Sequence, residues 1–382
     1  MAAESPLTIA IFADTNLSPN GVRTFCRTFR EWAQRTDSVR VVEVMPGLSD
    51  GETVSRNTTV ISIKPSARIP NPVYPEQLLG YYSRAKVTRI IEAIEGPKIV
   101  HIATPGMLSE VAAKVARSLD LPIVGCYHFD TRRQCVEPYL RVGGWISKTI
   151  ARFLDRRAYG TCLAMCAPSK TAADAAKSFY DGRVQVIPNP MDLDRFRPAA
   201  DREGAFRKRY ASDGKVLAVV IGRIAREKNL DLFGEYLLAD NRINTVFVGD
   251  GPYAGHLRRR WNATVTGFLR GDELTQAFQQ ADVFVQLSVA ETFGLTLAEA
   301  MTSGLPAVVL RSGGFVDTIP PGNGVEIVDR EDLDSLGDRC VALVGDEARH
   351  REASRRVRLF AGRLSADQVL PEFVDFHRAV LA

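Results

Sequence analysis

Two glutamates in the second half of the chain form its strongest chemical signal. Glu291 lies in a loop that follows a predicted buried strand. Glu299 lies in the first turns of a helix that is predicted to begin at Thr296 or Leu297. Gly294 allows the backbone to approach a ligand closely, and the free N–H groups at the start of a helix after a glycine turn bind anions. The pattern therefore predicts a site in which the two carboxylates contact different parts of one extended ligand.

Two cations follow a neighbouring predicted strand at residues 216–221. Arg223 comes directly after the glycine that ends this strand, and Lys228 lies in the same segment. Arginine presents a planar fork of donors and lysine a point charge, which together suit a diphosphate. Either cation alone could be a solvated surface residue. Because parallel strands end at one edge of a sheet, we expect both cations to reach the crevice of the glutamates.

Weaker signals lie at other predicted strand ends. Gly21 precedes a predicted helix and can place its amide near a phosphate. His128 ends a predicted strand and is expected to face the cleft. The glycine-rich run at 249–255 has one residue too many for a dinucleotide fingerprint. We interpret it as a turn that lines a nucleotide pocket, with Pro252 at the first helical position, and not as an NAD site.

The elements that must position these residues alternate between buried strands and amphipathic helices. Strands are predicted at 7–12, 39–44, 59–63, 99–102 and 122–127, with helices at 22–34 and 107–118, and further strands at 215–221, 245–248, 283–287 and 307–310. This β-α-β order implies right-handed crossovers in parallel sheets. The stretch between the two sets is rich in Pro, Asp and Arg and has no strand period, which places a domain boundary near residue 195.

We therefore expect an α/β chain of two Rossmann-like, doubly wound parallel-sheet domains that face each other across a central cleft. The first domain is predicted to span residues 1–194 and the second 195–364. A C-terminal helix over 365–382 is expected to pack back on the first domain. Ser365 and Gln368 could form a capping box for this helix, and Pro371 predicts a kink or a helix that starts there.

Composition narrows the classes of protein that remain. The 382 residues are 45% hydrophobic and 25% charged, which is typical of a globular chain. The 49 basic and 45 acidic residues leave a net charge of +4, too small to indicate a nucleic-acid binder. No apolar run is long enough to span a membrane, and the N-terminus lacks the basic segment of a secretory signal. We expect a cytoplasmic enzyme.

The chain resembles the retaining, nucleotide-sugar-dependent glycosyltransferases of family four, which have the GT-B fold. The resemblance rests on NGVR at 20–23, YHFD at 127–130, APSK at 167–170, VIPNPMDLDRF at 186–196, IGRIAREKN at 221–229, FVGDGP at 247–252, VTGFL at 265–269 and ETFGLTLAEAMTSGLPAV at 291–308. The last of these matches the family's E-x7-E motif. IPNPVYPE at 69–76 is similar to a narrower group, the GDP-mannose-dependent α-mannosyltransferases and sulfoquinovosyl-diacylglycerol synthases.

The resemblance implies a role for each predicted site residue. Arg223 and Lys228 would hold the donor diphosphate, Glu291 the transferred sugar and Glu299 the ribose, with His128 beside the reacting sugar. Backbone amides at Phe293, Gly294 and Leu295 would cradle phosphate and sugar, Gly21 would approach the phosphate, and Gly267, Phe268 and Leu269 would meet the base.

Two departures from the family pattern affect these expectations. Asn189-Pro190 replaces the usual Asn-Gly, which alters that turn. Phe129 replaces the usual Thr between His128 and Asp130, which affects the acceptor side.

The resemblance implies transfer of a hexose, mannose first, from GDP-mannose or a UDP-sugar, by front-face displacement in which the leaving phosphate assists deprotonation of the acceptor. Catalysis would come from positioning and from neutralising the diphosphate. No further cofactor and no metal are expected, because the D-x-D matches at 192–194 and 332–334 do not end strands at the cleft. A GT-B nucleotide-sugar epimerase, a Rossmann oxidoreductase and a non-enzymatic sugar-nucleotide scaffold remain as alternatives.

A membrane lipid or glycolipid is the first expectation for the acceptor, and a soluble glycan or metabolite is the alternative. Two predicted helices, at 22–35 and 145–159, are amphipathic and rich in Arg and Lys. Such helices can lie in an anionic membrane interface, which would place the enzyme peripherally on the inner face of the cell membrane. The other interpretation is that both are ordinary domain helices with solvated faces.

Overall fold

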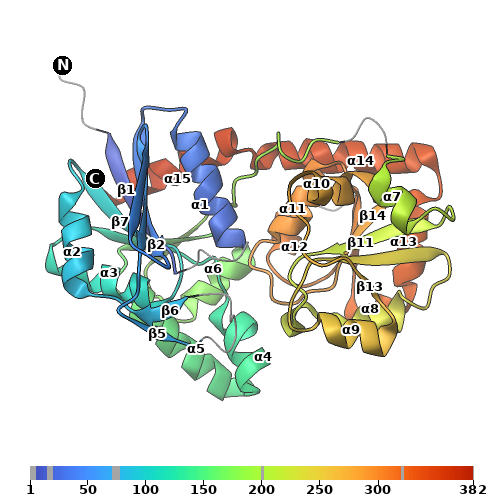
Figure 1. Cartoon of the computed structure of the whole chain (residues 1–382), viewed down its shortest axis with the longest axis horizontal. Coiled ribbons are helices and arrows are strands. Elements are labelled where there is room, and N and C mark those ends of the chain that lie inside the picture. Colours follow the sequence, from blue (N-terminus) through green and yellow to red (C-terminus); the bar gives the residue numbers. More distant parts are fainter. Residues whose placement is uncertain (1–5, 15–19, 71–77, 199–201, 320–321, 382) are drawn as a thin grey trace. The chain divides into compact units, whose positions relative to one another are not determined.

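The chain forms two compact α/β units, which Figure 1 displays in the colours of the sequence. The computed structural model describes residues 6–14, 20–70, 78–198, 202–319 and 322–381. Unit 1 comprises Met1–Pro190 together with Ala366–Ala382, and unit 2 comprises Met191–Ser365. The division therefore falls between Pro190 and Met191, where the sequence analysis placed it near residue 195. Most of the motif at 69–76 lies outside the described residues.

A mostly parallel sheet with strand order β10-β9-β8-β7-β1-β2-β4-β3 forms the centre of unit 1. Only β3 runs antiparallel to its neighbour. The strands are β1 (Leu7–Phe12), β2 (Val39–Pro46), β3 (Gly51–Ser55), β4 (Thr58–Ile63), β7 (Lys98–Ile102), β8 (Ile123–Cys126), β9 (Ala164–Ala167) and β10 (Arg183–Val186), and a separate antiparallel pair is formed by β5 (Ala67–Ile69) and β6 (Leu79–Tyr81). The central strands are buried and apolar, which is typical of parallel strands covered on both faces.

Helices cover both faces of this sheet. One face carries α1 (Gly21–Ala33) and α15 (Ala366–Leu381), and the other carries α2 (Arg84–Ala93), α3 (Met107–Ser118), α5 (Gly144–Tyr159) and α6 (Lys170–Lys177). Ile9 and Ile11 of β1 point toward the face that α1 and α15 cover, whereas Ala10 and Phe12 point toward the opposite face. This alternation is the two-residue period of a strand. Between β8 and α5 the chain forms the π-helical turn η1 (Arg132–Val136) and the short helix α4 (Glu137–Leu140).

The helix α1 uses its apolar face inside unit 1. Phe25 and Phe29 are buried, and both rings meet Phe373 of α15 edge-on at a centroid distance of 5.2 Å. The interpretation of this helix as a membrane-surface helix is therefore wrong, because its amphipathic pattern serves to receive α15. Among the described helices, none has both the length and the apolar character that crossing a bilayer requires.

The C-terminal helix α15 is anchored by a buried histidine pair. His377 Nδ1–H donates to the carbonyl of Phe373 at 2.7 Å, which leaves its Nε2 to accept from Nδ1–H of His101 at 3.0 Å. Burial lowers the pKa of His377 to about 4 and the pKa of His101 well below its ordinary value, so both rings are neutral near pH 7. The helix begins at Ala366 and contains Pro371, so the expectation of a helix start at Pro371 is wrong.

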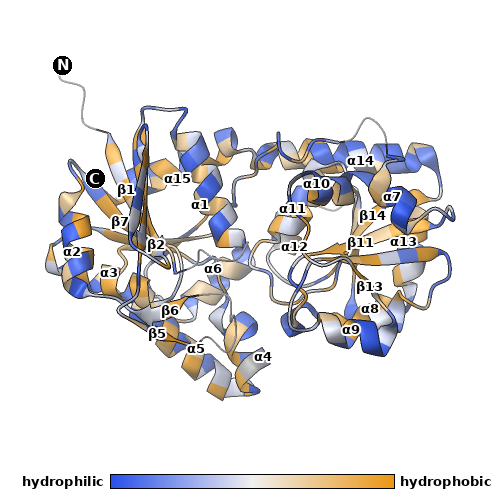
Figure 2. Ribbon diagram, in the orientation of Figure 1, coloured by the Kyte–Doolittle hydropathy of each residue, from blue (hydrophilic) through white to orange (hydrophobic). Residues whose placement is uncertain are grey.

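Unit 2 has a parallel sheet of order β13-β12-β11-β14-β15-β16. Its strands are β11 (Val216–Ile221), β12 (Ile243–Val248), β13 (Thr264–Val265), β14 (Val283–Gln286), β15 (Ala307–Leu310) and β16 (Val325–Val328). One face packs against α7 (Ala205–Tyr210), α10 (Gly271–Gln280), α11 (Leu295–Thr302) and α14 (Glu347–Ala361), and the other against α8 (Asp231–Tyr236), α9 (Ala254–Trp261) and α13 (Leu336–Val344). The short elements η2 (Arg226–Lys228), α12 (Phe315–Thr318), η3 (Arg330–Ser335) and η4 (Gly362–Leu364) complete the unit. In Figure 2 the apolar strands lie inside each unit and the helices have mixed faces.

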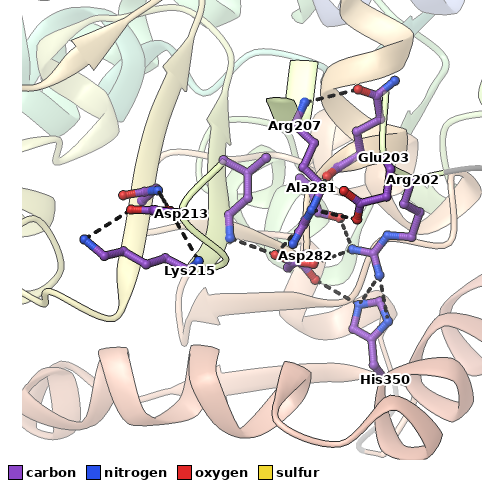
Figure 3. Close-up of polar contacts among 11 residues, drawn as sticks. Arg202, Glu203, Arg207, Asp213, Lys215, Ala281, Asp282 and His350 are labelled. Carbon is purple, nitrogen blue, oxygen red and sulfur yellow. Dashed lines mark hydrogen bonds and ion pairs between the residues drawn. The ribbon is translucent and has the colours of Figure 1, made fainter. Parts of the chain in front are cut away.

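A buried carboxylate joins several elements where β11 and β14 begin (Figure 3). Asp282 accepts from Arg202 at 2.7 Å and from Arg207 at 2.9 Å. It also accepts from the backbone N–H of Leu217 at 2.8 Å, while His350 of α14 donates to its carbonyl at 3.1 Å. These contacts lie at the amino ends of the strands. They give the buried carboxylate of Asp282 a structural role that requires no ligand.

Candidate functional site

The carboxyl ends of β11, β12, β14 and β15 share one edge of the unit 2 sheet, because the strands are parallel. The loops that leave β11 and β12 approach each other closely there. Gly249 has a φ of +147°, and a Cβ at this position would lie 1.9 Å from the carbonyl oxygen of Gly222. Only glycine fits this position, so the sequence GDG marks a tight turn at the sheet edge. Pro252 is not the first residue of a helix, since α9 begins at Ala254.

Arg223, just beyond the end of β11, is paired with a carboxylate in the same loop. Its Nη1 lies 3.1 Å from Oε1 of Glu227, and the side chains are 21% and 4% exposed. The pair holds the guanidinium in place without leaving a buried charge unpaired. Glu227 was not predicted, because nothing in the residue pattern indicates that this glutamate folds inward.

Lys228 and Glu291 meet directly, although 63 residues separate them. Lys228 Nζ donates to Oε1 of Glu291, and the same oxygen accepts from Nε2 of Gln286 at 2.9 Å. Asn229 takes a left-handed conformation and donates to the carbonyl of Leu287 at 3.2 Å, which ties the loop of Lys228 to the end of β14. The structure thus places the predicted lysine and the predicted carboxylate in one cluster.

The helix α11 starts at Leu295, earlier than the predicted start at Thr296 or Leu297. Gly294 is its N-cap with a φ of +85°, a left-handed conformation that glycine adopts without strain. Phe293 is 3% exposed and anchors the loop in the core. The first turn contains no acidic residue, so the N–H groups at this helix start favour an anion. Glu299 lies on the next turn of the same helix.

The predicted base-binding segment lies at the end of β13. Gly267 accepts from the N–H of Gly249 at 3.0 Å, which links the segment to the glycine turn after β12. Leu269 packs partly against the core. Phe268 is 47% exposed, with the guanidinium of Arg270 5.1 Å from its ring centroid. An exposed aromatic ring beside an arginine can stack on a planar base.

The remaining predicted residues lie in unit 1. Gly21 is the first residue of α1, and Asn20 caps the helix by accepting from the N–H of Arg23 at 3.0 Å. His128 follows β8 and packs against Phe25, with 4.7 Å between ring centroids. Burial lowers the pKa of His128 to about 4, so its imidazole is neutral near pH 7. Unit 1 therefore brings His128 to the first turns of α1.

The structure divides the predicted residues into two groups. His128 and Gly21 belong to unit 1, and the larger group belongs to unit 2: Arg223, Lys228, Gly267, Phe268, Leu269, Glu291, Phe293, Gly294, Leu295 and Glu299. Their roles toward a ligand remain predictions. Gln286 was not predicted either, although a polar residue in the otherwise apolar run of β14 is a signal that could have identified it.

Solved structures identify the fold. The chain superposes on Anabaena HepE, whose crystal structure is a complex with UDP-glucose, with a TM-score of 0.74 and 15% identity over 97% of this chain and 99% of that one. Two parallel-sheet α/β units together with this likeness show the GT-B fold, as expected from the sequence.

Family models and curated relatives identify the family. Residues 215–346 match the model of glycosyl transferases group 1, and residues 19–195 match that of Glycosyltransferase Family 4. A GDP-mannose-dependent alpha-mannosyltransferase of Mycobacterium tuberculosis is 30% identical over 91% of this chain and 91% of its own length. Sulfoquinovosyl transferase SQD2 of Arabidopsis thaliana is 33% identical over 68% of this chain, although the match spans only 54% of that protein. The chain belongs to glycosyltransferase family 4 and is an enzyme of that class.

Proposed function

We propose that this chain is a retaining hexosyltransferase that transfers mannose from GDP-mannose to a hydroxyl group of a membrane lipid or glycolipid. The cluster of Lys228 with Glu291, at the same sheet edge as the start of α11, carries the proposal. A cation, a carboxylate and free helix N–H groups together suit a sugar diphosphate. The mannosyltransferase among the relatives supports the choice of sugar.

In the proposed reaction the bond from the sugar carbon to the diphosphate breaks while the acceptor oxygen attacks from the same face. The acceptor proton passes to a phosphate oxygen of the leaving group. Arg223 and Lys228 neutralise the charge that develops on the diphosphate, and the N–H groups of α11 bind the same oxygens. Glu291 stabilises the sugar carbon as it gains positive charge, and Glu299 binds the ribose. The resemblance assigns His128, a neutral imidazole, to a position beside the reacting sugar.

A panel of donors tests the proposed sugar and base. The purified chain is incubated with radiolabelled GDP-mannose, GDP-glucose, UDP-glucose and UDP-galactose, together with total lipid extract. Transfer of label from GDP-mannose into the organic phase is expected, and the anomeric configuration of the product reports retention. Transfer from a UDP-sugar alone would reject the proposed donor. Because the two cations supply the charge neutralisation, we expect activity to persist in excess EDTA.

The surface of α5 supports a lipid acceptor. The buried residues of this helix include Ser147 and Asp155, whereas Trp145 is 75% exposed and Phe153 is 60% exposed. Figure 2 shows apolar segments on this helix. Lys148 and Arg152 lie on the exposed side, and neither forms an ion pair with a described residue. We call these four exposed residues (Trp145, Lys148, Arg152 and Phe153) the α5 surface.

Apolar rings surrounded by cations suit the interface of an anionic bilayer. Each cation near such a surface contributes about 1 kcal/mol of attraction. The occupant that we propose for the α5 surface is therefore a bilayer that contains anionic lipid, from which the acceptor is taken.

Vesicle co-sedimentation tests this surface. The chain should bind phosphatidylglycerol-containing vesicles at low salt, bind them less at high salt, and not bind pure phosphatidylcholine. The double variant Trp145→Ser/Phe153→Ser should lose binding, whereas Leu359→Ser should retain it. Leu359 of α14 is a matched control, because it is 67% exposed and belongs to unit 2. Equal binding by both variants would reject α5 as the membrane surface, and absence of binding by the wild-type chain at low salt would favour a soluble acceptor.

A further inference from the structure

Gln286 is a polar residue at a position where the fold calls for an apolar one. It ends β14, after Val283, Phe284 and Val285, and its partner in the neighbouring strand β15 is Val309. β14 lies inside the sheet, between β11 and β15. The side chain of Gln286 is buried, with 8% of the residue exposed. An apolar residue of the same size would pack here without the cost of burying an amide.

Only half of this buried amide is satisfied. Its Nε2 donates to Oε1 of Glu291 at 2.9 Å, whereas its Oε1 is buried and accepts from no described residue. Exchanging the two amide atoms would turn the oxygen toward a carboxylate, so the charge of Glu291 decides the orientation. An unsatisfied buried acceptor costs stability. The stability of unit 2 therefore does not explain Gln286, and its single contact with Glu291 is the remaining explanation.

Glu291 is held from one side only. Both of its donors, Nζ of Lys228 and Nε2 of Gln286, bind Oε1. No described residue donates to Oε2. The two donors differ in mobility, because Lys228 is a long side chain with 27% exposure, while Gln286 is confined by the sheet. In the proposed function the diphosphate of the donor attracts Lys228, and Gln286 is then the donor that stays on Oε1.

We propose that Gln286 is a positioning residue for the transfer reaction: its amide fixes Oε1 of Glu291 and leaves Oε2 to the transferred sugar. This inference rests on the proposed function, in which Glu291 faces the sugar. A fixed carboxylate stabilises a developing positive charge without reorganising during the reaction. Loss of Gln286 should therefore slow the chemical step more than it weakens binding of the donor.

The test replaces Gln286 by methionine, which preserves volume and apolar packing. Gln286→Met should lower kcat by about 10- to 150-fold, the range of one hydrogen bond to a charged group. The donor KM should stay within about threefold, since the diphosphate contacts persist. The melting temperature should not fall, because the unsatisfied oxygen is removed.

Gln280→Met is the matched control. Gln280 is also a buried amide, but it serves the N-terminus of α7 by accepting from the N–H groups of Phe206 and Arg207 at 2.9 and 3.2 Å. This variant should lower the melting temperature and leave kcat per folded molecule unchanged. A drop in kcat of equal size in both variants would overturn the inference, because a general loss of packing would then explain it.

A double-mutant cycle separates action through Glu291 from independent action. In a Glu291→Gln background, Gln286→Met should have no further effect on kcat. An equal reduction in both backgrounds would overturn the inference. Inactivity of the wild-type chain with every donor would reject the proposed function instead. Donor-free crystal structures decide the inference even then: the Glu291 carboxylate should keep its position in Lys228→Ala, where Gln286 still holds Oε1, and should leave it in Lys228→Ala/Gln286→Met. A carboxylate that stays in place in the double variant overturns the inference.

Discussion

Replacement of Lys228 by alanine gives the most direct test of the unit 2 site. In the absence of a donor, the ammonium group of Lys228 binds Oε1 of Glu291, and the two side chains are 27% and 15% exposed. A hydrogen bond to a charged group contributes about 1.5–3 kcal/mol. Because each 1.4 kcal/mol corresponds to about a factor of ten in rate, Lys228→Ala should lower kcat/KM by roughly 10- to 150-fold. The cation strengthens its contact as the leaving diphosphate gains charge, so kcat should fall as well as kcat/KM.

The matched control is Lys215→Ala. Lys215 is a lysine next to the same strand β11, but at its amino end, where its ammonium group pairs with Asp213 at 3.3 Å (Figure 3). An exposed pair of this kind contributes about 0–1 kcal/mol of stability and should contribute nothing to turnover. Steady-state kinetics with radiolabelled donor, on variants with unchanged circular dichroism, measure both. If Lys228→Ala stays within threefold of the wild type, as Lys215→Ala should, the assignment of the diphosphate site to this edge is refuted.

Further predictions concern the two carboxylates and the buried ionisable groups. Glu291→Gln should lower kcat more than it raises the donor KM, and Glu299→Gln should do the reverse, as kinetics on both variants will measure. Asp282→Asn should lower the free energy of unfolding by about 3–5 kcal/mol in urea titrations, because two guanidinium groups lose their buried partner. Burial raises the pKa of Asp155 to about 7 from an ordinary 3.8. The contribution of Asp155 to stability is therefore full below pH 3.8 and is lost as the pH rises through 7. In melting curves across this range, rising pH should destabilise Asp155→Asn less than the wild type. Burial lowers the pKa of His377 to about 4 from an ordinary 6.5, so its contribution is full above pH 6.5 and is lost as the pH falls through 4, and His377→Gln should flatten the acid side of the same curves.

Buried strands and their neighbouring loops were predictable because their signals are local. The strand Ala307–Leu310 and the helix Met107–Ser118 have the bounds that the sequence indicates. Both are apolar or amphipathic segments with clear limits. The start of α11 was placed too late because Gly294 caps the helix in a left-handed conformation, and residue type alone does not distinguish a glycine in the loop from a glycine at the cap.

Contacts between distant segments were not predictable in the same way. The apolar stripe of α1 is compatible with a membrane surface or with a core. Only the arrival of Phe373 from the other end of the chain decides between them. The same holds for Lys228, whose position on Glu291 depends on the order of β11 and β14 in the sheet. Glu227 carries no local signal and is explained only by its contact with Arg223, whereas Gln286 is marked locally as a polar residue in an apolar strand and its role depends on the contact with Glu291.

Without a bound donor, carboxylates balance the charges of both cations in the unit 2 site, and this balance affects how the site would bind a diphosphate. Arg223 is paired with Glu227, and Lys228 with Glu291, so each cation has a carboxylate partner. In the proposed function a diphosphate competes with both carboxylates, which lowers affinity but avoids partly buried, unpaired cations in the free enzyme. The approach of a diphosphate to Arg223 and its approach to Lys228 have different consequences for the two carboxylates. Glu227 is 4% exposed and stays behind Arg223 as a support, whereas Glu291, once Lys228 turns to the phosphate, becomes an uncompensated carboxylate beside the sugar. In the proposed function, binding of the leaving group itself therefore supplies the negative charge that the developing sugar cation requires.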